Sequence, residues 1–367
     1  MGIQSIDVYP VVLRYREPFR IALGTEVESQ SVVVRIHTDS EAIGIGEASP
    51  FEMVTHETQK TVMQTLDKIA PTLIGMDPLR IEQIVETMDQ AVTENPSAKA
   101  AIDIALHDIL GRTSRKPLFK LIGGFRKDVL TDITLGIKEP KEMAEDAIRA
   151  VKKGFTVLKV KVGVDPKEDF ERIKGIREAV GSDIAIRIDA NQGWTTHQAI
   201  EILKKLEPFN VEIAEQPVKA DDIRGLAEVR RNSSVPVMAD ESVHTPNDAL
   251  RVVNEEAVDL INIKLMKSGG ILKAKKIAAI AESANVSCMI GCMSESAIGI
   301  AAGVHLAAAI KNIQYADLDS DIILQDKLVL KGGAKLRASR RIPLQKPGLG
   351  ILQIDEKLLG KPVKIYE

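Results

Sequence analysis

Six charged residues stand at nearly even spacing, each at or near the end of a short apolar run: Lys161, Asp189, Glu215, Asp240, Lys264 and Asp319. The first five are separated by 28, 26, 25 and 24 residues. A strand followed by a helix takes about that length, so the spacing predicts one ionisable group at the end of each successive parallel strand. In a βα barrel these strand ends meet at one site. Three carboxylates flanked there by lysines would hold a divalent cation between two bases.

The three carboxylates come from consecutive predicted strands, Asp189 in IDAN, Glu215 in EQP and Asp240 in ADES. A hard cation such as Mg²⁺ accepts such oxygen ligands and keeps further positions for water and substrate. The alternative is that each acid pairs with a basic neighbour or faces solvent. No Cys/His set with zinc spacing competes with the triad. The pattern predicts one Mg²⁺ ion, with Mn²⁺ as a substitute.

Lys159 and Lys161 would point to the same face of their strand, because side chains alternate along a strand. Two like charges ~4 Å apart at an effective dielectric constant of about 20 interact by about 4 kcal/mol. This repulsion predicts a lowered lysine pKa and a neutral general base near pH 7. The alternative is that both side chains extend into water from a helix. The apolar residues that flank them favour a strand.

Lys264, in INIKLMKSGG, comes from the strand across the predicted barrel from Lys161. A single lysine at a strand end is also a common partner in a structural ion pair. Here it would face the other side of a site that already has a metal and a base. Two bases on opposite faces of an α-carbon could remove a proton from one side and return it on the other.

Asp317 and Asp319, in YADLDSD, follow the eighth apolar run and would share one strand face. They would repel each other unless they meet a cation such as a substrate ammonium group. The alternative is a solvated loop. Cys292 and Ser294 follow the seventh run and either reach the site or pack as small residues at the strand end.

The composition argues against several other classes of protein. The net charge is −3, and no basic run carries interleaved aromatic residues, so we expect no nucleic-acid partner. No apolar stretch approaches the ~20 residues of a membrane span, and the first residues lack a signal-peptide pattern. Cys288 and Cys292 are too few for a disulfide framework. On one strand face they would lie roughly 13 Å apart, too far to bridge, so we expect a reduced, cytoplasmic protein.

The elements that position these residues fall into two patterns. Residues 1–50 alternate as antiparallel strands, and a helical stripe follows over 97–112, with Ser97 as its expected N-cap. From about residue 130 strands and helices alternate, which gives eight strands from 133–136 to 315–319. After residue 320 short strands and turns follow, and we expect them to pack back on the N-terminal unit. At 367 residues the chain is long enough for two domains.

These motifs together resemble the muconate-lactonizing subgroup of the enolase superfamily, over essentially the whole chain. The resemblance rests on the Lys159–Lys161 pair, the DAN, EQP and ADES carboxylates, and NIKLMKSGG. It implies an α/β fold, a modified TIM barrel (β/α)₇β with an N-terminal α+β capping domain completed by the C-terminal tail. The expected divisions are 1–125 for the capping domain, 126–322 for the barrel and 323–367 for the returning segment.

Within that subgroup, the DLD of Asp317 and Asp319 resembles the signature of dipeptide epimerases, in which both acids hold the substrate α-ammonium group. By position, Lys161 and Lys264 would be the acid/base catalysts and Lys159 would help to bind the carboxylate. Thr134, Cys292 and Ser294 match positions that line the family's substrate site. Family members that act on alanyl-glutamate carry an arginine at the place of Gly24. The glycine therefore favours neutral or hydrophobic dipeptides over acidic ones, and Ile21, Leu23, Phe51 and Met53 could form an apolar wall.

The expected activity is that of an isomerase, an Mg-dependent epimerase that converts an L,L-dipeptide to the L,D form through an enediolate. Three alternatives share the metal and lysines: N-acylamino acid racemase, o-succinylbenzoate synthase and a muconate cycloisomerase-like enzyme. An alternative of another class is a metal-binding barrel without catalysis. The expected partner is a small dipeptide, with no membrane and no nucleic acid, and a homo-oligomer stays open.

Overall fold

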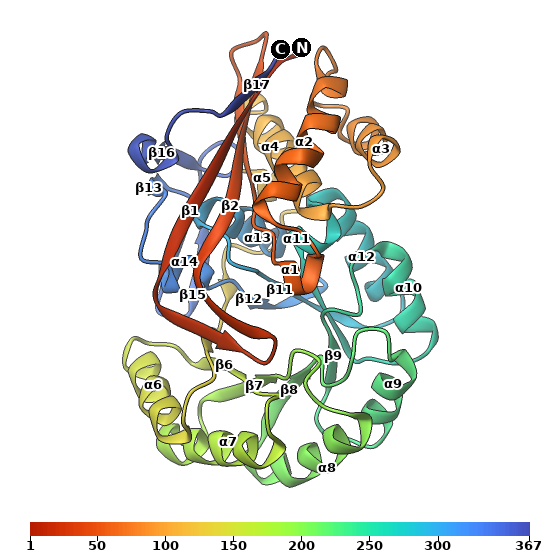
Figure 1. Ribbon diagram of the computed structural model, residues 1–367, viewed down its shortest axis with the longest axis vertical. Coiled ribbons are helices and arrows are strands. Elements are labelled where there is room, and N and C mark those ends of the chain that lie inside the picture. Colours follow the sequence, from red (N-terminus) through yellow and green to blue (C-terminus); the bar gives the residue numbers. More distant parts are fainter.

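The computed structural model describes residues 1–367 and consists of a capping domain beside an eight-stranded barrel (Figure 1). The capping sheet is antiparallel, with strand order β17-β1-β2-β3. Its strands are β1 (Ile3–Ile21), β2 (Gly24–Thr38), β3 (Ile43–Ala48) and β17 (Lys364–Tyr366). The last strand pairs with β1, so the C-terminal end of the chain lies against the N-terminal strand.

Helices cover one side of this sheet: α1 (Glu52–Thr55), α2 (Gln59–Leu73), α3 (Ile81–Ala91), α4 (Pro96–Thr113) and α5 (Leu118–Leu121). Helix α4 packs directly on β3 because that strand carries glycines at the contact. A Cβ atom on Gly46 would lie 1.9 Å from the carbonyl oxygen of Ala101. The close approach lets α4 bury almost all of its residues, so the helix anchors the capping domain.

The expected N-cap of α4 is wrong. The helix begins at Pro96, and Asn95 in the left-handed region is its N-cap residue. Ser97 lies inside the helix, where its backbone N–H donates to Glu57 Oε2 at 3.0 Å. A carboxylate near a helix N-terminus is favoured by the free N–H groups and the helix dipole. The cap thus comes from a loop 40 residues earlier in the chain.

The barrel is a parallel sheet with strand order β12-β11-β10-β9-β8-β7-β6-β5. Its strands are β5 (Ile133–Leu135), β6 (Val157–Lys161), β7 (Ala185–Asp189), β8 (Val211–Glu215), β9 (Val237–Ala239), β10 (Leu260–Lys264), β11 (Ser287–Gly291) and β12 (Ile313–Asp317). A parallel bridge between Thr131 and Ala316 brings the first and last strands together. The predicted fold class, with eight strands and a separate capping sheet, is confirmed.

Helices follow the barrel strands: α6 (Pro140–Lys152), α7 (Pro166–Val180), α8 (Thr196–Leu206), α9 (Ile223–Arg231), α10 (Pro246–Asn254), α11 (Leu265–Ser268), α12 (Ile271–Ser283), α13 (Ala297–Ala309) and α14 (Ser320–Ile323). Local sequence sets several of their ends. Thr245 caps α10 by accepting from the Asp248 N–H, with Pro246 at the first helical position. Asp165 caps α7 in the same way.

The segment after α14 contacts both parts of the molecule. Its elements are β13 (Val329–Gly332), β14 (Ala334–Arg337), β15 (Arg340–Pro343), β16 (Ile351–Ile354) and α15 (Glu356–Leu359). Strand β15 pairs with β4 (Val129–Leu130), which precedes the barrel, whereas β17 joins the capping sheet. The division of the chain at residues 125 and 322 stays a prediction.

A long hairpin extends from the capping domain across the barrel. Figure 1 shows the β1–β2 ribbon reaching from the top of the molecule to the upper ends of β6, β7 and β8. A register irregularity between Arg14 and Phe19 breaks the regular pairing of the two strands before their tip. The hairpin therefore places residues of the capping domain over the mouth of the barrel.

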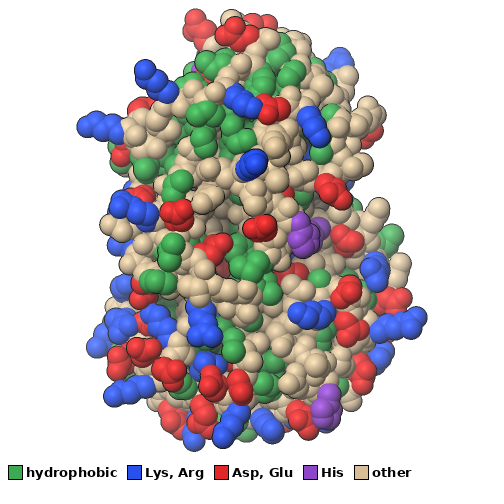
Figure 2. Space-filling view, in the orientation of Figure 1, with side chains coloured by type: hydrophobic (Ala, Val, Ile, Leu, Met, Phe, Trp, Pro, Cys, Tyr) green, Lys and Arg blue, Asp and Glu red, His purple; other side chains and the backbone are tan.

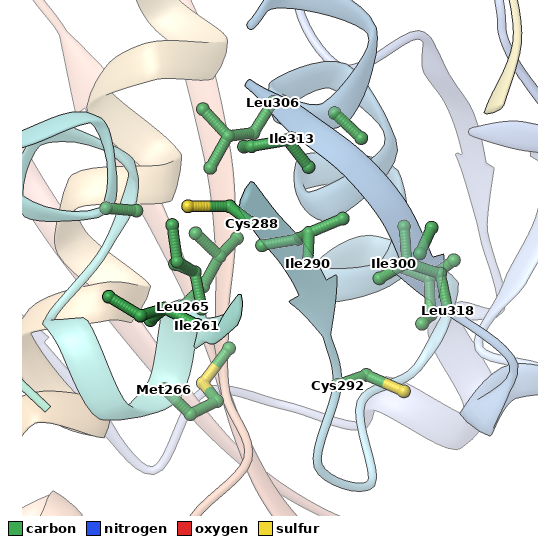
Figure 3. Packing of buried hydrophobic residues seen from close by; sticks show 14 of the residues in the cluster. Ile261, Leu265, Met266, Cys288, Ile290, Cys292, Ile300, Leu306, Ile313 and Leu318 are labelled. Atoms are coloured by element: carbon green, nitrogen blue, oxygen red, sulfur yellow. The ribbon is translucent and has the colours of Figure 1, made fainter. Parts of the chain in front are cut away.

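Both cysteines are free and buried. Cys288 lies within β11 among apolar residues of the barrel wall, whereas Cys292 follows the last residue of that strand (Figure 3). Their sulfur atoms point in opposite directions, so the expectation of a shared strand face is wrong. The alternation of side chains applies only inside the strand, which ends at Gly291.

The surface carries both signs of charge. Figure 2 shows acidic and basic side chains interspersed over the barrel half of the visible face. None of the helices combines the length and the apolarity that a membrane span requires.

Candidate active site

Asp189, Glu215 and Asp240 meet at the mouth of the barrel, as their spacing predicts. Asp189 and Glu215 are the last residues of β7 and β8, and Asp240 follows the end of β9. One oxygen from each lies within 4.8 Å of the others, and all three residues are buried. Burial and the charge of Asp189 raise the pKa of Glu215 to about 8. The carboxylates of the triad therefore repel one another when all are ionised. A divalent cation that takes oxygen ligands fits this donor set.

Lys159 lies among the acids of the site and shares one of them, Asp189, with Lys161. Its Nζ is 3.0 Å from Asp189 Oδ2, 2.8 Å from Glu215 Oε2 and 2.7 Å from Asp317 Oδ2. Burial alone would lower the pKa of Lys159, but these carboxylates raise it well above its usual value. The expectation that repulsion between two lysines lowers the pKa is therefore wrong for Lys159, because three carboxylates contact its ammonium group directly.

Lys161 is held at the mouth by two partners. Its Nζ donates to Asp189 Oδ2 at 2.6 Å and to Asn191 Oδ1 at 3.0 Å. Asn191 has a left-handed backbone conformation with φ of 41°, and its Nδ2 donates to Glu241 Oε1 at 3.0 Å. The amide of Asn191 thus fixes the direction from which the lysine approaches the site.

Lys264 reaches the triad from β10. Its Nζ donates to Asp240 Oδ2 at 2.8 Å. Burial opposes the charge on Lys264, yet Asp240 raises the pKa of this lysine. The other oxygen of Asp240 lies 2.6 Å from Nζ of Lys267, which is also buried and bonded to the carbonyl oxygens of Val243 and Asn262. Lys267 therefore positions a carboxylate of the triad and does not face the mouth.

Asp317 and Asp319 form a second acidic group with Cys292. Asp319 Oδ2 accepts a hydrogen bond of 2.6 Å from the backbone N–H of Thr134, and Thr134 Oγ1 donates to Asp317 Oδ1 at 3.3 Å. Burial raises the pKa of Asp319 to about 6, and the charge of Asp317 acts in the same direction. Cys292 Sγ lies 3.8 Å from Asp319 Oδ1. The solvated-loop alternative is thus wrong, because both acids are buried.

A cavity of about 60 Å³ joins the barrel mouth to the capping hairpin. Lys161 and Lys264 both line it, together with Cys292 and Ser294. The capping domain contributes Phe19, Ile21, Gly24, Glu26, Phe51 and Val54. Of the four residues expected to form an apolar wall, Ile21 and Phe51 do so. Leu23 and Met53 do not line the cavity, although the methyl group of Met53 lies against Gly24.

Several residues of the site escaped the sequence analysis. Asn191 and Glu241 stand inside the DAN and ADES motifs, next to the predicted metal ligands Asp189 and Asp240. The only sequence signal for Lys267 is its place three residues after Lys264 in NIKLMK. Glu26 had no such signal, because its place depends on the path of the β1–β2 hairpin.

Two family models match the chain. Residues 4–123 match the N-terminal domain of mandelate racemase and muconate lactonizing enzyme, and residues 142–358 match the enolase C-terminal domain-like model. A crystal structure of a dipeptide epimerase from Enterococcus faecalis, complexed with Mg and the dipeptide L-Leu-L-Tyr, superposes with a TM-score of 0.94. It shares 45% identity and covers 96% of this chain and 100% of its own.

Relatives with curated activities also match along nearly their whole length. A hydrophobic dipeptide epimerase from Enterococcus faecalis is 45% identical over 96% of this chain and 99% of its own. An L-Ala-D/L-Glu epimerase from Clostridium acetobutylicum is 43% identical over 96% and 99%. An N-succinyl-L-Arg/Lys racemase from Bacillus cereus is 38% identical over 98% and 97%. The chain belongs to the mandelate racemase and muconate lactonizing enzyme family of the enolase superfamily.

Proposed function

We propose that the protein is an Mg²⁺-dependent dipeptide epimerase that inverts the α-carbon of the C-terminal residue. The observation that carries the proposal is the placement of the two lysines. Lys161 and Lys264 come from β6 and β10, line one cavity and bond to different carboxylates of the triad. A substrate carboxylate beside the triad would leave its α-carbon between two proton-transfer groups.

Lys161 and Lys264 have different roles in this reaction. One takes the α-proton from its face and the other delivers a proton to the opposite face, so the centre inverts. A bound Mg²⁺, held by Asp189, Glu215 and Asp240, would supply positive charge where the substrate carboxylate gains negative charge. Lys159 adds a fixed ammonium group beside the same carboxylates, and Asn191 orients Lys161.

The acids at the end of β12 support a dipeptide rather than an acylated amino acid. Asp317 and Asp319 are buried beside the cavity and would pair with the free α-ammonium group of the first residue. An N-acylated substrate has no such charge and would leave Asp319 without a cation, whereas Asp317 keeps its ion pair with Lys159. We infer that N-acylamino acid racemisation is the weaker candidate, although a curated relative carries out a reaction of that kind.

The capping side of the cavity supports non-acidic substrates. The whole cavity is lined by no lysine or arginine other than Lys161 and Lys264, which both come from the barrel. The position of Gly24 offers no charge, and the neighbouring space is taken by the apolar end of Met53. We therefore propose neutral or hydrophobic residues at the C-terminal position. A cytoplasmic location stays a prediction, and the oligomeric state stays open.

The test is a dipeptide library incubated with the protein and Mg²⁺ in D₂O, with mass spectrometry of the α-position. Epimerisation should introduce deuterium at the C-terminal α-carbon of neutral and hydrophobic dipeptides, and chiral chromatography should show the L,D product. Matched N-acetylated dipeptides serve as the control. Deuterium uptake confined to the N-acetylated set would contradict the proposal and favour the racemase.

A further inference from the structure

A substrate held as proposed has one α-substituent without an assigned partner. The α-hydrogen faces a lysine, the carboxylate faces the triad, and the peptide nitrogen leads toward Asp317 and Asp319. The remaining substituent is the side chain of the C-terminal residue. It must enter the part of the cavity that the capping domain closes, where Ile21, Phe51 and Val54 are apolar and Glu26 is charged.

The carboxylate of Glu26 has few hydrogen-bond partners within the protein. Its Oε2 lies 3.4 Å from the hydroxyl of Tyr15, at the long limit of a hydrogen bond. That hydroxyl also donates to Ser294 Oγ at a much closer approach, and one hydroxyl carries only one hydrogen. No lysine, arginine or histidine forms an ion pair with Glu26. A half-buried carboxylate in this situation favours a donor brought by the ligand.

No cation reaches Glu26 from the outer side either. Glu26 and Ser294 also line a neighbouring groove of about 230 Å³. The groove is lined almost entirely by polar residues, and its charged side chains are all glutamates: Glu26, Glu28, Glu52 and Glu57. Glu57 is engaged by Ser97 and Ala98. Glu26 thus lies where the apolar capping side of the cavity meets an acidic surface groove.

We propose that Glu26 is a specificity-determining residue, which favours C-terminal side chains that have an apolar stem and end in a hydrogen-bond donor. A phenol hydroxyl and an ammonium group are two donors with this chemistry. The apolar stem would pack on Ile21 and Phe51, and the donor would reach Glu26. Burial supports this role: it takes water from the Glu26 carboxylate and raises its pKa to about 7, so a donor in the cavity would replace part of the lost solvation. The inference rests on the proposed function: among neutral side chains it favours the phenol, and it adds side chains that end in an ammonium group.

The test compares two pairs of dipeptides that differ at the tip of the side chain. Ala-Tyr against Ala-Phe isolates the hydroxyl group, and Ala-Lys against Ala-norleucine isolates the ammonium group. We expect the wild-type protein to prefer the donor in each pair, with ratios of kcat/KM of about 3 to 30. A preference in the lysine pair alone would support selection by charge, and one in the tyrosine pair alone would support selection by hydrogen bonding.

Two variants separate charge from hydrogen-bond acceptance. Glu26→Met removes the acceptor at similar side-chain length and should bring both ratios close to one. Glu26→Gln keeps a neutral acceptor, so it should keep the tyrosine preference and lose the lysine preference. Glu28→Met is the matched control. Glu28 stands on the same strand and lines the groove but not the cavity, so both ratios should stay at their wild-type values.

The outcomes distinguish this inference from the proposed function. Deuterium uptake by all four dipeptides with ratios near one, or with ratios that Glu26→Met leaves unchanged, would overturn the role of Glu26 alone. Absence of uptake with every dipeptide of the library would overturn the epimerase activity and the inference with it. The melting temperature of each variant, measured with Mg²⁺, shows whether a loss of activity comes from unfolding. If Glu26→Met unfolds, the ratio of kcat/KM for Ala-Lys over Ala-norleucine in the isosteric variant Glu26→Gln decides the outcome.

Discussion

Lys159 and Asp317 form a buried ion pair, with 2.7 Å between Nζ and Oδ2. The same Nζ contacts Asp189 and Glu215, so one ammonium group links the metal triad to the eighth strand. Burial would raise the pKa of Asp317, but Lys159 outweighs it and lowers the pKa to about 2. Asp317 is therefore already paired, and Asp319 is the freer carboxylate for a substrate ammonium group.

Lys161 and Lys264 should act on opposite faces of the substrate α-carbon, so single substitutions should separate their roles. Lys161→Ala and Lys264→Ala should each lower epimerisation by about 10²–10⁴-fold, because each removes one of two proton-transfer groups. Each variant should still exchange the α-proton that faces its remaining lysine. By the family resemblance, Lys264→Ala should retain deuterium exchange into the L,L-dipeptide, and Lys161→Ala into the L,D form. Interconversion of the epimers at the wild-type rate by either variant would refute the two-base mechanism.

Removal of the metal should abolish activity and should be reversible. Treatment with a chelator should stop turnover, and added Mg²⁺ or Mn²⁺ should restore it. Glu215→Gln should weaken Mg²⁺ binding measured by calorimetry, because the neutral amide cannot offset the charge of the ion. Glu212→Gln, on the same strand but paired with Arg187, should bind Mg²⁺ normally. Full turnover by metal-free protein would contradict the assignment of the triad.

Gly24→Arg should extend the substrate range to acidic side chains. A Cβ atom at this position would approach Met53 Cε to 2.7 Å, and the flexible end of Met53 can move aside. The guanidinium group would then offer a charge at the capping side of the cavity, and kcat/KM for Ala-Glu should rise about tenfold. Gly24→Gln serves as the uncharged control. A wild-type protein that already prefers Ala-Glu over neutral dipeptides would contradict the proposed specificity.

Asp319 should recognise the free amine of the substrate. Asp319→Asn removes the charge but keeps an oxygen acceptor for the Thr134 N–H. We expect kcat/KM for dipeptides to fall by about tenfold or more, because a charged hydrogen bond is lost. N-acetylated dipeptides should be poor substrates of the wild type and should lose little further in the variant. Equal losses for free and acetylated substrates would show that Asp319 acts without contacting the amine.

Glu295 should make stability depend on pH. Burial and the nearby charge of Glu47 raise the pKa of Glu295 to about 8 in the folded protein, against about 4.5 for a free glutamate. The folded state binds more protons between these values, so its stability should fall as pH rises from about 5 to 8. One group limits this slope to about 1.4 kcal/mol per pH unit.

Urea unfolding from pH 5 to pH 8 measures this dependence. Glu295→Gln cannot ionise, so its free energy of unfolding should rise relative to the wild type across that range. The exposed Glu171→Gln provides the control, with a constant difference. A constant difference for Glu295→Gln as well would show that Glu295 does not titrate in this range.

Much of the site could be predicted from the sequence because strand ends have simple geometry. Side chains alternate along a strand, and parallel strands at regular intervals bring their last residues to one mouth. The positions of Asp189, Glu215 and Lys264 follow from those two rules alone. Local sequence also sets some helix ends, such as the cap at Thr245, since a cap involves residues that are neighbours in the chain.

What the sequence could not decide were contacts between segments far apart in the chain. The N-cap role expected of Ser97 failed because Glu57 reaches that helix from another loop. The raised pKa of Lys159 depends on carboxylates from β7, β8 and β12, whose charges outweigh the neighbouring lysine at these short distances. Glu26 faces the substrate cavity because the β1–β2 hairpin crosses the barrel mouth, and only tertiary packing determines that crossing. The strand periodicity thus determined which ionisable residues meet at the barrel mouth. The packing of distant segments decided the surroundings that shift their pKa values and the capping residues that line the cavity.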